Sequence, residues 1–246
     1  MYLCPQSNPL LNSDKTMKKR FFTAWVLLIL VAVSAWSQQA KYVFYFIGDG
    51  MGVNQVNGTE AYRAELEGRI GITPLLFTQF PFATMATTYS ANSKITDSAA
   101  AGTALATGHK TKNSTLGLLP DLKTEVNSIA VKAQKAGARV GIATSVSIDH
   151  ATPAAFYAHV PSRDSRYEIG KQLISAGFDF YAGSDFDRPT NRKDPEEGTL
   201  YEQSEKAGYT IVRGYKEYQK KARKADKIIL LQSEEASQRD RGSIPY

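Results

Sequence analysis

A short, unbroken apolar run that ends in a glycine-rich turn constrains the fold of this chain most strongly. Residues Tyr42–Ile47 read YVFYFI, and Gly48–Gly52 follow as GDGMG. Apolar residues without alternation predict a strand of a parallel sheet, because helices cover both faces of such a strand. The glycines permit a sharp turn, which brings the Asp49 carboxylate close to any ligand at the carboxyl end of that strand.

The GDGMG turn favours a cation over a dinucleotide as its ligand. It lacks the G-x-G-x-x-G spacing of a dinucleotide-binding loop, and the carboxylate of Asp49 would repel a pyrophosphate. A hard or borderline cation suits the carboxylate better. The alternative is an ordinary Asp-Gly turn that binds nothing.

Strand and helix patterns alternate along the rest of the chain. Further strands are predicted at residues 82–89, 139–144, 178–181, 209–213 and 227–231. Helices are predicted at residues 53–65, 98–107, 125–136, 167–176, 200–207 and 215–224. This alternation indicates a layered α/β architecture with a largely parallel sheet.

The segment Thr96–Gly108 (TDSAAAGTALATG) predicts a helix whose first turn carries a hydroxyl. Asp97 and Ser98 precede a run of small residues, and Gly108 is a suitable C-terminal cap. Free backbone N–H groups at a helix start attract anions, so Ser98 is a candidate nucleophile in an anion site. The alternative is that Asp97 and Ser98 only cap the helix.

A third segment, Ser147–Arg163, contains the sequence His150-Ala151-Thr152-Pro153. Pro153 suits the first position of a helix, with Thr152 as its cap, so His150 and Thr152 are expected at a strand-to-helix junction. Ligands of open α/β sheets bind at such junctions.

The first 37 residues predict a leader with a secretory signal. Met17-Lys18-Lys19-Arg20 is followed by an apolar run and by Ala35-Trp36-Ser37, which suits cleavage after Ser37. Met17 is the expected start, and the apolar run is shorter than the ~20 residues that a spanning helix needs. We therefore expect a periplasmic or extracellular protein that keeps no stable membrane anchor after signal cleavage.

Charge and cysteine content exclude some functions. Without the four cations and one carboxylate of the leader, the net charge falls from +6 to +3, which gives no signal for nucleic-acid binding. Cys4 is the sole cysteine and lies in the leader, so disulfides and thiolate chemistry are not expected in the exported protein.

The three motifs, strand-GDGMG, TDSAAAGTA and HATP with an arginine eleven residues after its threonine, together resemble the alkaline phosphatase family. The resemblance runs from about Lys41 to Arg163 and implies a three-layer αβα sandwich with a largely parallel central sheet. It also implies a metal-dependent hydrolase of phosphate monoesters that works through a phosphoserine intermediate and uses Zn²⁺ and Mg²⁺. A homodimer is a further expectation.

The resemblance implies a role for each motif residue. Asp49 resembles the carboxylate that bridges a zinc and the magnesium, Thr152 resembles the magnesium ligand, and His150 is an added candidate metal ligand. Ser98 resembles the nucleophile. Arg163 resembles the guanidinium that holds two phosphate oxygens, and Asp97 would orient it. The chemistry agrees, since a serine without a neighbouring general base needs a metal to activate it.

The remaining zinc ligands and the magnesium glutamate of the family have no counterpart in this sequence. We therefore expect residues 38–246 to be the amino-terminal part of the catalytic domain, incomplete at its carboxyl end. Two other interpretations stay open: a phosphodiesterase or sulfatase relative of the same superfamily, and a non-catalytic fragment that binds metal or phosphate.

Overall fold

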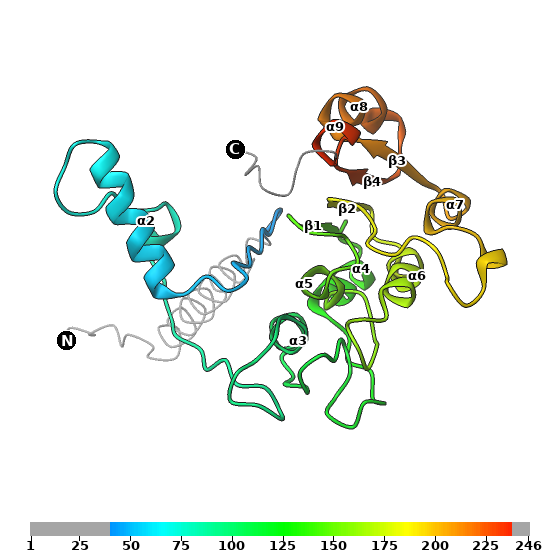
Figure 1. Ribbon diagram of the computed structural model, residues 1–246, viewed down its shortest axis with the longest axis horizontal. Helices are drawn as coiled ribbons and strands as arrows, with labels where there is room; N and C mark the ends of the chain where they lie inside the picture. Colours follow the sequence, from blue (N-terminus) through cyan, green and yellow to red (C-terminus); the bar gives the residue numbers. More distant parts are fainter. Residues whose placement is uncertain (1–39, 238–246) are drawn as a thin grey trace, which may run out of the picture. The chain divides into compact units, whose positions relative to one another are not determined.

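The computed structural model describes residues 40–237 (Figure 1). The chain divides into two units, Met1–Gly48 and Asp49–Tyr246, and each is described by itself. The predicted leader, residues 1–37, lies outside the described part. Over residues 40–237, the structure has no helix long and apolar enough to cross a membrane.

Four parallel strands form the sheet in the described part of the second unit. They are β1 (Gly141–Ala143), β2 (Phe180–Gly183), β3 (Tyr209–Arg213) and β4 (Lys227–Leu231), in the spatial order β1-β2-β4-β3. Tyr181 of β2 lies opposite Ile142 of β1 and Ile229 of β4, so β2 pairs on both sides. The parallel α/β class that the sequence predicts is therefore confirmed.

Helices and 3₁₀ turns separate these strands. The α-helices are α2 (Val53–Leu66), α3 (Ser98–Thr107), α4 (Ile129–Lys135), α5 (Ala151–Ala154), α6 (Arg166–Ala176), α7 (Leu200–Lys206), α8 (Gly214–Lys221) and α9 (Glu234–Ser237). The 3₁₀ turns are η1 (Phe77–Gln79), η2 (Pro195–Glu197) and η3 (Ala222–Lys224).

Local capping fixes several helix ends. The Ser128 hydroxyl accepts a hydrogen bond from the Val131 N–H at the start of α4, and Thr199 forms a capping box with Glu202 at the start of α7. Gly108 ends α3 in the left-handed conformation with φ of 80°. This is the C-terminal cap that the sequence predicts.

Adjacent residues of β2 show that helices cover both faces of the sheet. The Phe180 ring meets the Tyr218 ring of α8 at 6.1 Å between centroids. The Tyr181 hydroxyl donates to the Leu173 carbonyl of α6 at 3.0 Å. Because successive side chains of a strand point to opposite faces, α8 and α6 lie on opposite sides of the sheet (Figure 1).

Aromatic side chains fill the core on the α6 side of the sheet. The Tyr181 ring packs edge-on against Tyr157 at 5.6 Å and stacks with Phe178 at 5.9 Å. These three side chains are buried, and the Tyr209 hydroxyl donates to the Phe178 carbonyl at 2.9 Å. Burial of each such ring stabilises the fold by about 1.5–3 kcal/mol, and the hydroxyl bonds remove the cost of burying polar atoms.

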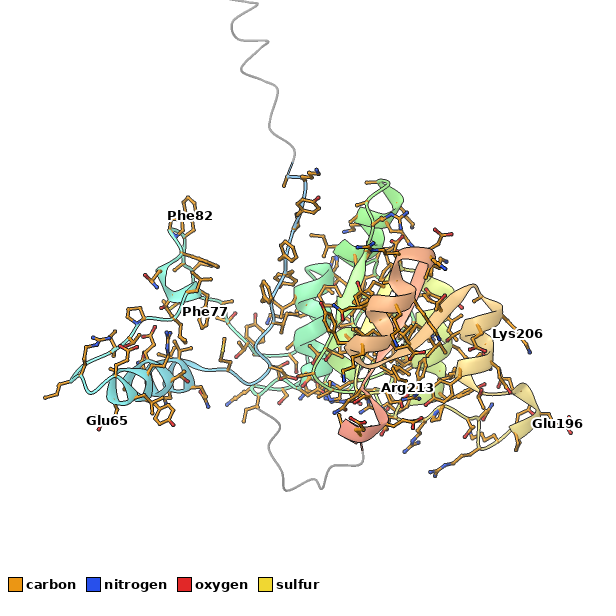
Figure 2. The ribbon with its side chains drawn as sticks, turned by 90° about the horizontal axis from the view of Figure 1, so that it is seen from above. Glu65, Phe77, Phe82, Glu196, Lys206 and Arg213 are labelled. Atoms are coloured by element: carbon orange, nitrogen blue, oxygen red, sulfur yellow. The ribbon has the colours of Figure 1, made fainter. Side chains whose placement is uncertain are left out.

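Two predicted strands are wrong. The run Tyr42–Ile47 and residues 82–89 have no strand structure, and most of their large side chains are exposed, as with Phe46 at 88% and Phe82 at 91%. Figure 2 shows the Phe82 side chain projecting away from the ribbon. A strand needs a neighbour for its N–H and C=O groups, and within residues 40–237 neither run has one in the sheet.

Several boundaries also differ from the prediction. The helix expected at 125–136 begins only at Ile129, because Ser128 caps it, and the strand expected at 139–144 is limited to Gly141–Ala143. The predicted strand at 178–181 lies at Phe180–Gly183, two residues later.

Candidate active site

Helix α3 presents Ser98 as its first residue. Asp97 is the N-cap, and its Oδ1 accepts a hydrogen bond from the Ala100 N–H at 2.9 Å. The small residues of this helix allow close packing on α5, since a Cβ added to Gly102 would lie 3.0 Å from the Ala155 Cβ. This packing brings the start of α3 near Thr152.

The loop after β1 carries His150 and Thr152 into the same region. His150 is the N-cap of α5, and its Nδ1 accepts from the Thr152 N–H at 3.5 Å. Thr152 therefore lies within the first turn, and the prediction that it caps the helix is wrong. Pro153 is still tolerated there, because first-turn N–H groups have no partner within the helix.

The buried carboxylate of Asp149, next to His150, fixes this loop through hydrogen bonds. Asp149 is fully buried, and its oxygens accept from the Asp187 N–H at 3.0 Å and the Arg188 N–H at 3.3 Å. Arg166 donates to the Asp149 carbonyl at 2.9 Å and lies 3.8 Å from its carboxylate. Burial raises the pKa of Asp149, while these donors and the cation oppose that rise.

Asp49 joins the two helix starts. Its Oδ2 accepts hydrogen bonds from the Ser98 hydroxyl and from the Thr152 hydroxyl, each at 3.0 Å. Three residues that are 49 and 54 positions apart in the chain thus meet at one carboxylate oxygen. The sequence predicts this grouping only through the resemblance to a family, because spacing alone does not connect the three motifs.

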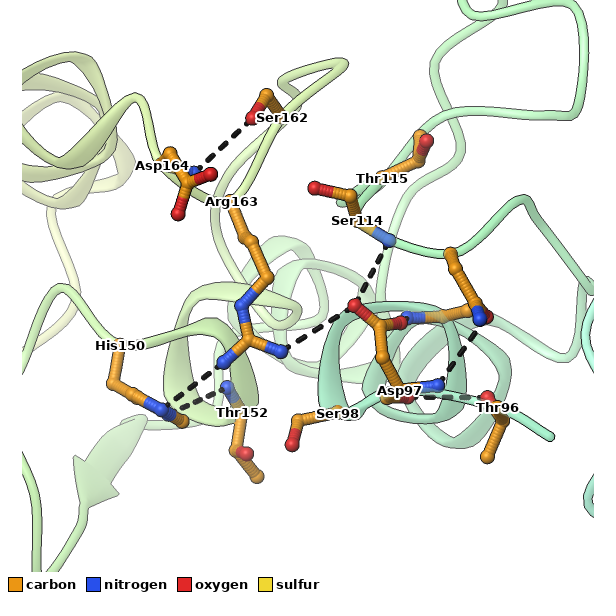
Figure 3. Close-up of polar contacts among 12 residues, drawn as sticks. Thr96, Asp97, Ser98, Ser114, Thr115, His150, Thr152, Ser162, Arg163 and Asp164 are labelled. Carbon is orange, nitrogen blue, oxygen red and sulfur yellow. Dashed lines mark hydrogen bonds and ion pairs between the residues drawn. The ribbon is translucent and has the colours of Figure 1, made fainter.

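The two arms of the Arg163 guanidinium are each held by a neighbouring side chain (Figure 3). Its Nη1 donates to Asp97 Oδ2 at 3.3 Å, and its Nη2 lies 3.2 Å from His150 Nε2. About a quarter of each ion-pair side chain is exposed, 23% for Arg163 and 25% for Asp97. The guanidinium therefore keeps access to solvent while its plane is fixed.

The pKa of His150 lies below its ordinary value. Burial is the largest cause, and the positive charges of Arg166 and Arg163 lower it further. A neutral ring has one acceptor nitrogen, so it accepts either from Arg163 at Nε2 or from the Thr152 N–H at Nδ1, whereas a protonated ring would repel the guanidinium. In the tautomer that accepts at Nε2, His150 holds one arm of the Arg163 guanidinium.

The oxygen atoms around Asp49 supply part of the ligand set that a hard cation needs. Three oxygen atoms, from Asp49, Ser98 and Thr152, converge there, and oxygen ligands are those that Mg²⁺ prefers. Residues 40–237 contain no group of three or more His, Cys, Asp or Glu side chains able to hold a metal ion. The described residues therefore fit part of a magnesium site and do not complete a zinc site.

Sequence reasoning missed the segment Asn113–Ser114. The Ser114 N–H donates to Asp97 Oδ2 at 2.9 Å, and the Asn113 side chain accepts from the Asp97 N–H at 3.2 Å. Asn and Ser favour turns, so the sequence could have indicated a turn here, but not its contact with Asp97.

The fold and this cluster define an α/β protein in which a hydroxyl, a carboxylate and a guanidinium come together at the starts of two helices. A family model described as "Alkaline phosphatase" matches residues 40–177, more than half of the chain. The chain belongs to the alkaline phosphatase family.

Curated relatives agree with this assignment. The mouse tissue-nonspecific isozyme of alkaline phosphatase is 34% identical over 203 residues, which cover 71% of this chain and 38% of the relative. Alkaline phosphatase 4 of Drosophila melanogaster is 33% identical over 156 residues, which cover 60% of this chain and 26% of the relative. The chain thus spans well under half the length of these relatives.

Solved structures show the same fold. The alkaline phosphatase of the Antarctic bacterium TAB5 matches with a TM-score of 0.66 and 29% identity, covering 76% of this chain and 52% of that one. A variant of the same protein, described with Mg bound, gives 0.67 at 29% identity and covers 76% and 51%. The Thermus thermophilus alkaline phosphatase gives 0.64 at 29% identity, covering 76% and 39%.

Proposed function

We propose that this chain carries the nucleophile and the phosphate-binding residues of an alkaline phosphatase that hydrolyses phosphate monoesters. The observation that carries the proposal is the shared carboxylate oxygen of Asp49, which accepts from both Ser98 and Thr152 at 3.0 Å. The fixed guanidinium of Arg163 beside Ser98 supports it, because a planar fork suits two oxygens of a phosphoryl group.

The reaction would proceed by two displacements at phosphorus. In the first, Ser98 Oγ forms a bond to phosphorus, the ester P–O bond breaks, and the hydroxyl proton passes to the departing alcohol. In the second, a water oxygen bonds to phosphorus, the bond to Ser98 Oγ breaks, one proton of the water passes to Ser98 Oγ, and inorganic phosphate leaves. Arg163 would hold two nonbridging oxygens through both steps, where negative charge develops.

Asp49, Thr152 and His150 are the residues that would hold metal ions on this chain. Bound zinc and magnesium would supply activation of the serine hydroxyl and stabilisation of the departing oxygen. The Asp49 carboxylate accepts a hydrogen bond from the Ser98 hydroxyl, so it also fixes the direction of Ser98 Oγ. Asp97 and His150 fix the guanidinium plane.

The proposal includes two points about the whole protein. The chain would be the amino-terminal part of the catalytic domain, since it spans 38% of the mouse relative and holds no three-residue metal group within residues 40–237. It would be exported after cleavage near Ser37, because residues 17–37 have the composition of a secretory signal.

Replacing the nucleophile tests the function. In a form of the protein that extends over the full length of the family, Ser98→Ala should lower turnover of an aryl phosphate by at least about 10³-fold. Bound zinc and magnesium, measured by mass spectrometry of the metals, should stay unchanged, because most ligands are other residues. Ser175→Ala is the matched control, since Ser175 is exposed on α6 and donates only to the Lys171 carbonyl.

A non-catalytic phosphate- or metal-binding protein is the second candidate. It is favoured by the lack of a group of three or more metal-binding side chains in the described part of the chain. In that case Ser98→Ala would leave any measured turnover unchanged, whereas Arg163→Ala would still remove phosphate binding. Turnover that survives Ser98→Ala would therefore contradict the phosphoserine proposal.

A further inference from the structure

Ser114 has a backbone conformation that its residue type disfavours. Its φ is 75°, and Leu122 at 62° is the other non-glycine residue with a positive φ in the described part of the chain. Left-handed backbone is uncommon outside glycine, because the Cβ then crowds the chain. A serine held in this region has its conformation imposed by the surrounding structure.

The backbone of Ser114 links both partners of the site ion pair. Its N–H donates to Asp97 Oδ2 at 2.9 Å, the oxygen that also accepts from Arg163 Nη1. Its carbonyl accepts from the Arg163 backbone N–H at 2.7 Å. One residue therefore fixes the carboxylate that orients the guanidinium and the backbone from which the guanidinium extends (Figure 3).

The residues around Ser114 hold it from both sides. Before it, the Asn113 side chain accepts from the Asp97 N–H at 3.2 Å and donates to the Ile95 carbonyl at 2.9 Å. After it, Leu116 pairs with Val160 through an antiparallel bridge, three residues before Arg163. The segment from 113 to 116 thus connects the start of α3 to the chain that carries Arg163.

We propose that Ser114 is a positioning residue for Arg163, and that its left-handed backbone sets the distance between the guanidinium and Ser98. The proposal rests on the phosphate-binding role proposed for Arg163. At a negative φ, the N–H and the C=O of residue 114 would point in different directions, so the bonds to Asp97 and Arg163 would not form together. The backbone N–H and C=O of Ser114 make both contacts, and the role of its side chain is limited to tolerating the positive φ.

Three variants of the 246-residue chain test this. Ser114→Val should weaken binding of inorganic phosphate, measured by equilibrium dialysis, by about tenfold, because a β-branched residue resists positive φ. Ser114→Gly should keep the affinity within about twofold, because glycine adopts this conformation freely. Leu122→Val is the matched control: Leu122 also has a positive φ, but within residues 40–237 its turn makes no hydrogen bond or ion pair with Arg163 or Asp97.

A second measurement separates positioning from general destabilisation. In Ser114→Val, the amide protons of residues 114 and 163 should exchange at least about tenfold faster, because their hydrogen bonds are lost. In Leu122→Val, exchange at both positions should stay as in the parent chain.

The outcomes distinguish this proposal from the proposed function. Ser114→Val with unchanged exchange at residue 163 would overturn the positioning role, whatever the phosphate affinity. A parent chain that binds no phosphate would contradict the role of Arg163, and the placement of Arg163 by Ser114 would then be decided by amide exchange alone. Equal loss of affinity in Ser114→Val and Leu122→Val would also overturn the proposal.

Discussion

The two sides of the candidate active site rest on very different supports. Ser98 begins a helix in which six of the ten residues are buried, and Arg163 is tied to Asp97, His150 and Ser114. Asp49, in contrast, is exposed in a turn, and the following helix α2 buries only Glu60 and Ala64. The side proposed to bind phosphate is preorganised by packing within the described residues, whereas the side proposed to bind metal depends on a carboxylate with little local support.

The same contrast separates two apolar runs. Residues 227–231 form β4, in which Ile228, Ile229 and Leu231 are buried between neighbours on both sides. The run Tyr42–Ile47 has a similar composition, but Phe46 is 88% exposed and the run joins none of the four strands. An apolar pattern thus indicates that a segment suits a buried strand, while the presence of a neighbouring strand decides whether that strand forms.

The largest expected effect concerns catalysis by the 246-residue chain alone. With zinc and magnesium added, its turnover of an aryl phosphate at alkaline pH should be at least about 10³-fold below that of a form with the full length of the family. The reason is that a cation held by so few protein groups stays hydrated and exchanges readily. Turnover that is robust and lost in Ser98→Ala would show that the 246-residue chain holds a complete set of metal ligands, and the side of the site that contains Asp49 would then need no support from outside the chain.

The next effect sharpens the contrast between the apolar runs. Ile229→Ala in β4 should lower the free energy of unfolding by about 2–5 kcal/mol, because Ile229 is fully buried. Phe46→Ala should change it by less than about 0.5 kcal/mol, because its ring lies in solvent. Urea unfolding followed by circular dichroism measures both, and a large loss in Phe46→Ala would mean that the run is buried in solution.

The sequence predicts those features that depend on local chemistry. The strands at 209–213 and 227–231, the helix of Ser98 and the Gly108 cap are confirmed, because capping and hydrophobic pattern act within a few residues. The same reasoning fails at Thr152, where His150 takes the cap, since either side chain can accept a bond at a helix start. The strands at 42–47 and 82–89 fail because pairing is a long-range property.

The site was predictable to the extent that a family pattern links distant motifs. Asp49, Ser98 and Thr152 meet at one oxygen although no local rule connects them. The Ser114 contacts and the buried Asp149 were not predicted, because they arise from tertiary hydrogen bonds to backbone groups. Neither residue type nor spacing carries that information.

Arg163→Lys tests the preorganised side of the site. One ammonium replaces a planar fork, so the variant should bind inorganic phosphate about tenfold more weakly while its fold stays intact. Arg139→Lys is a suitable control, because Arg139 makes an exposed ion pair with Asp179. Unchanged phosphate affinity in Arg163→Lys would remove this guanidinium from the site.

The smallest effect compares the two site carboxylates directly. Asp97→Ala should lower the free energy of unfolding by about 0.5–2 kcal/mol, because it removes the cap of α3. Asp49→Ala should change it by less than about 0.5 kcal/mol, because its partners are two hydroxyls at an exposed position that water can satisfy. Thermal unfolding without added metal measures both. Equal losses would show that Asp49 also supports the fold, and the division into a preorganised and an unsupported side would then not hold.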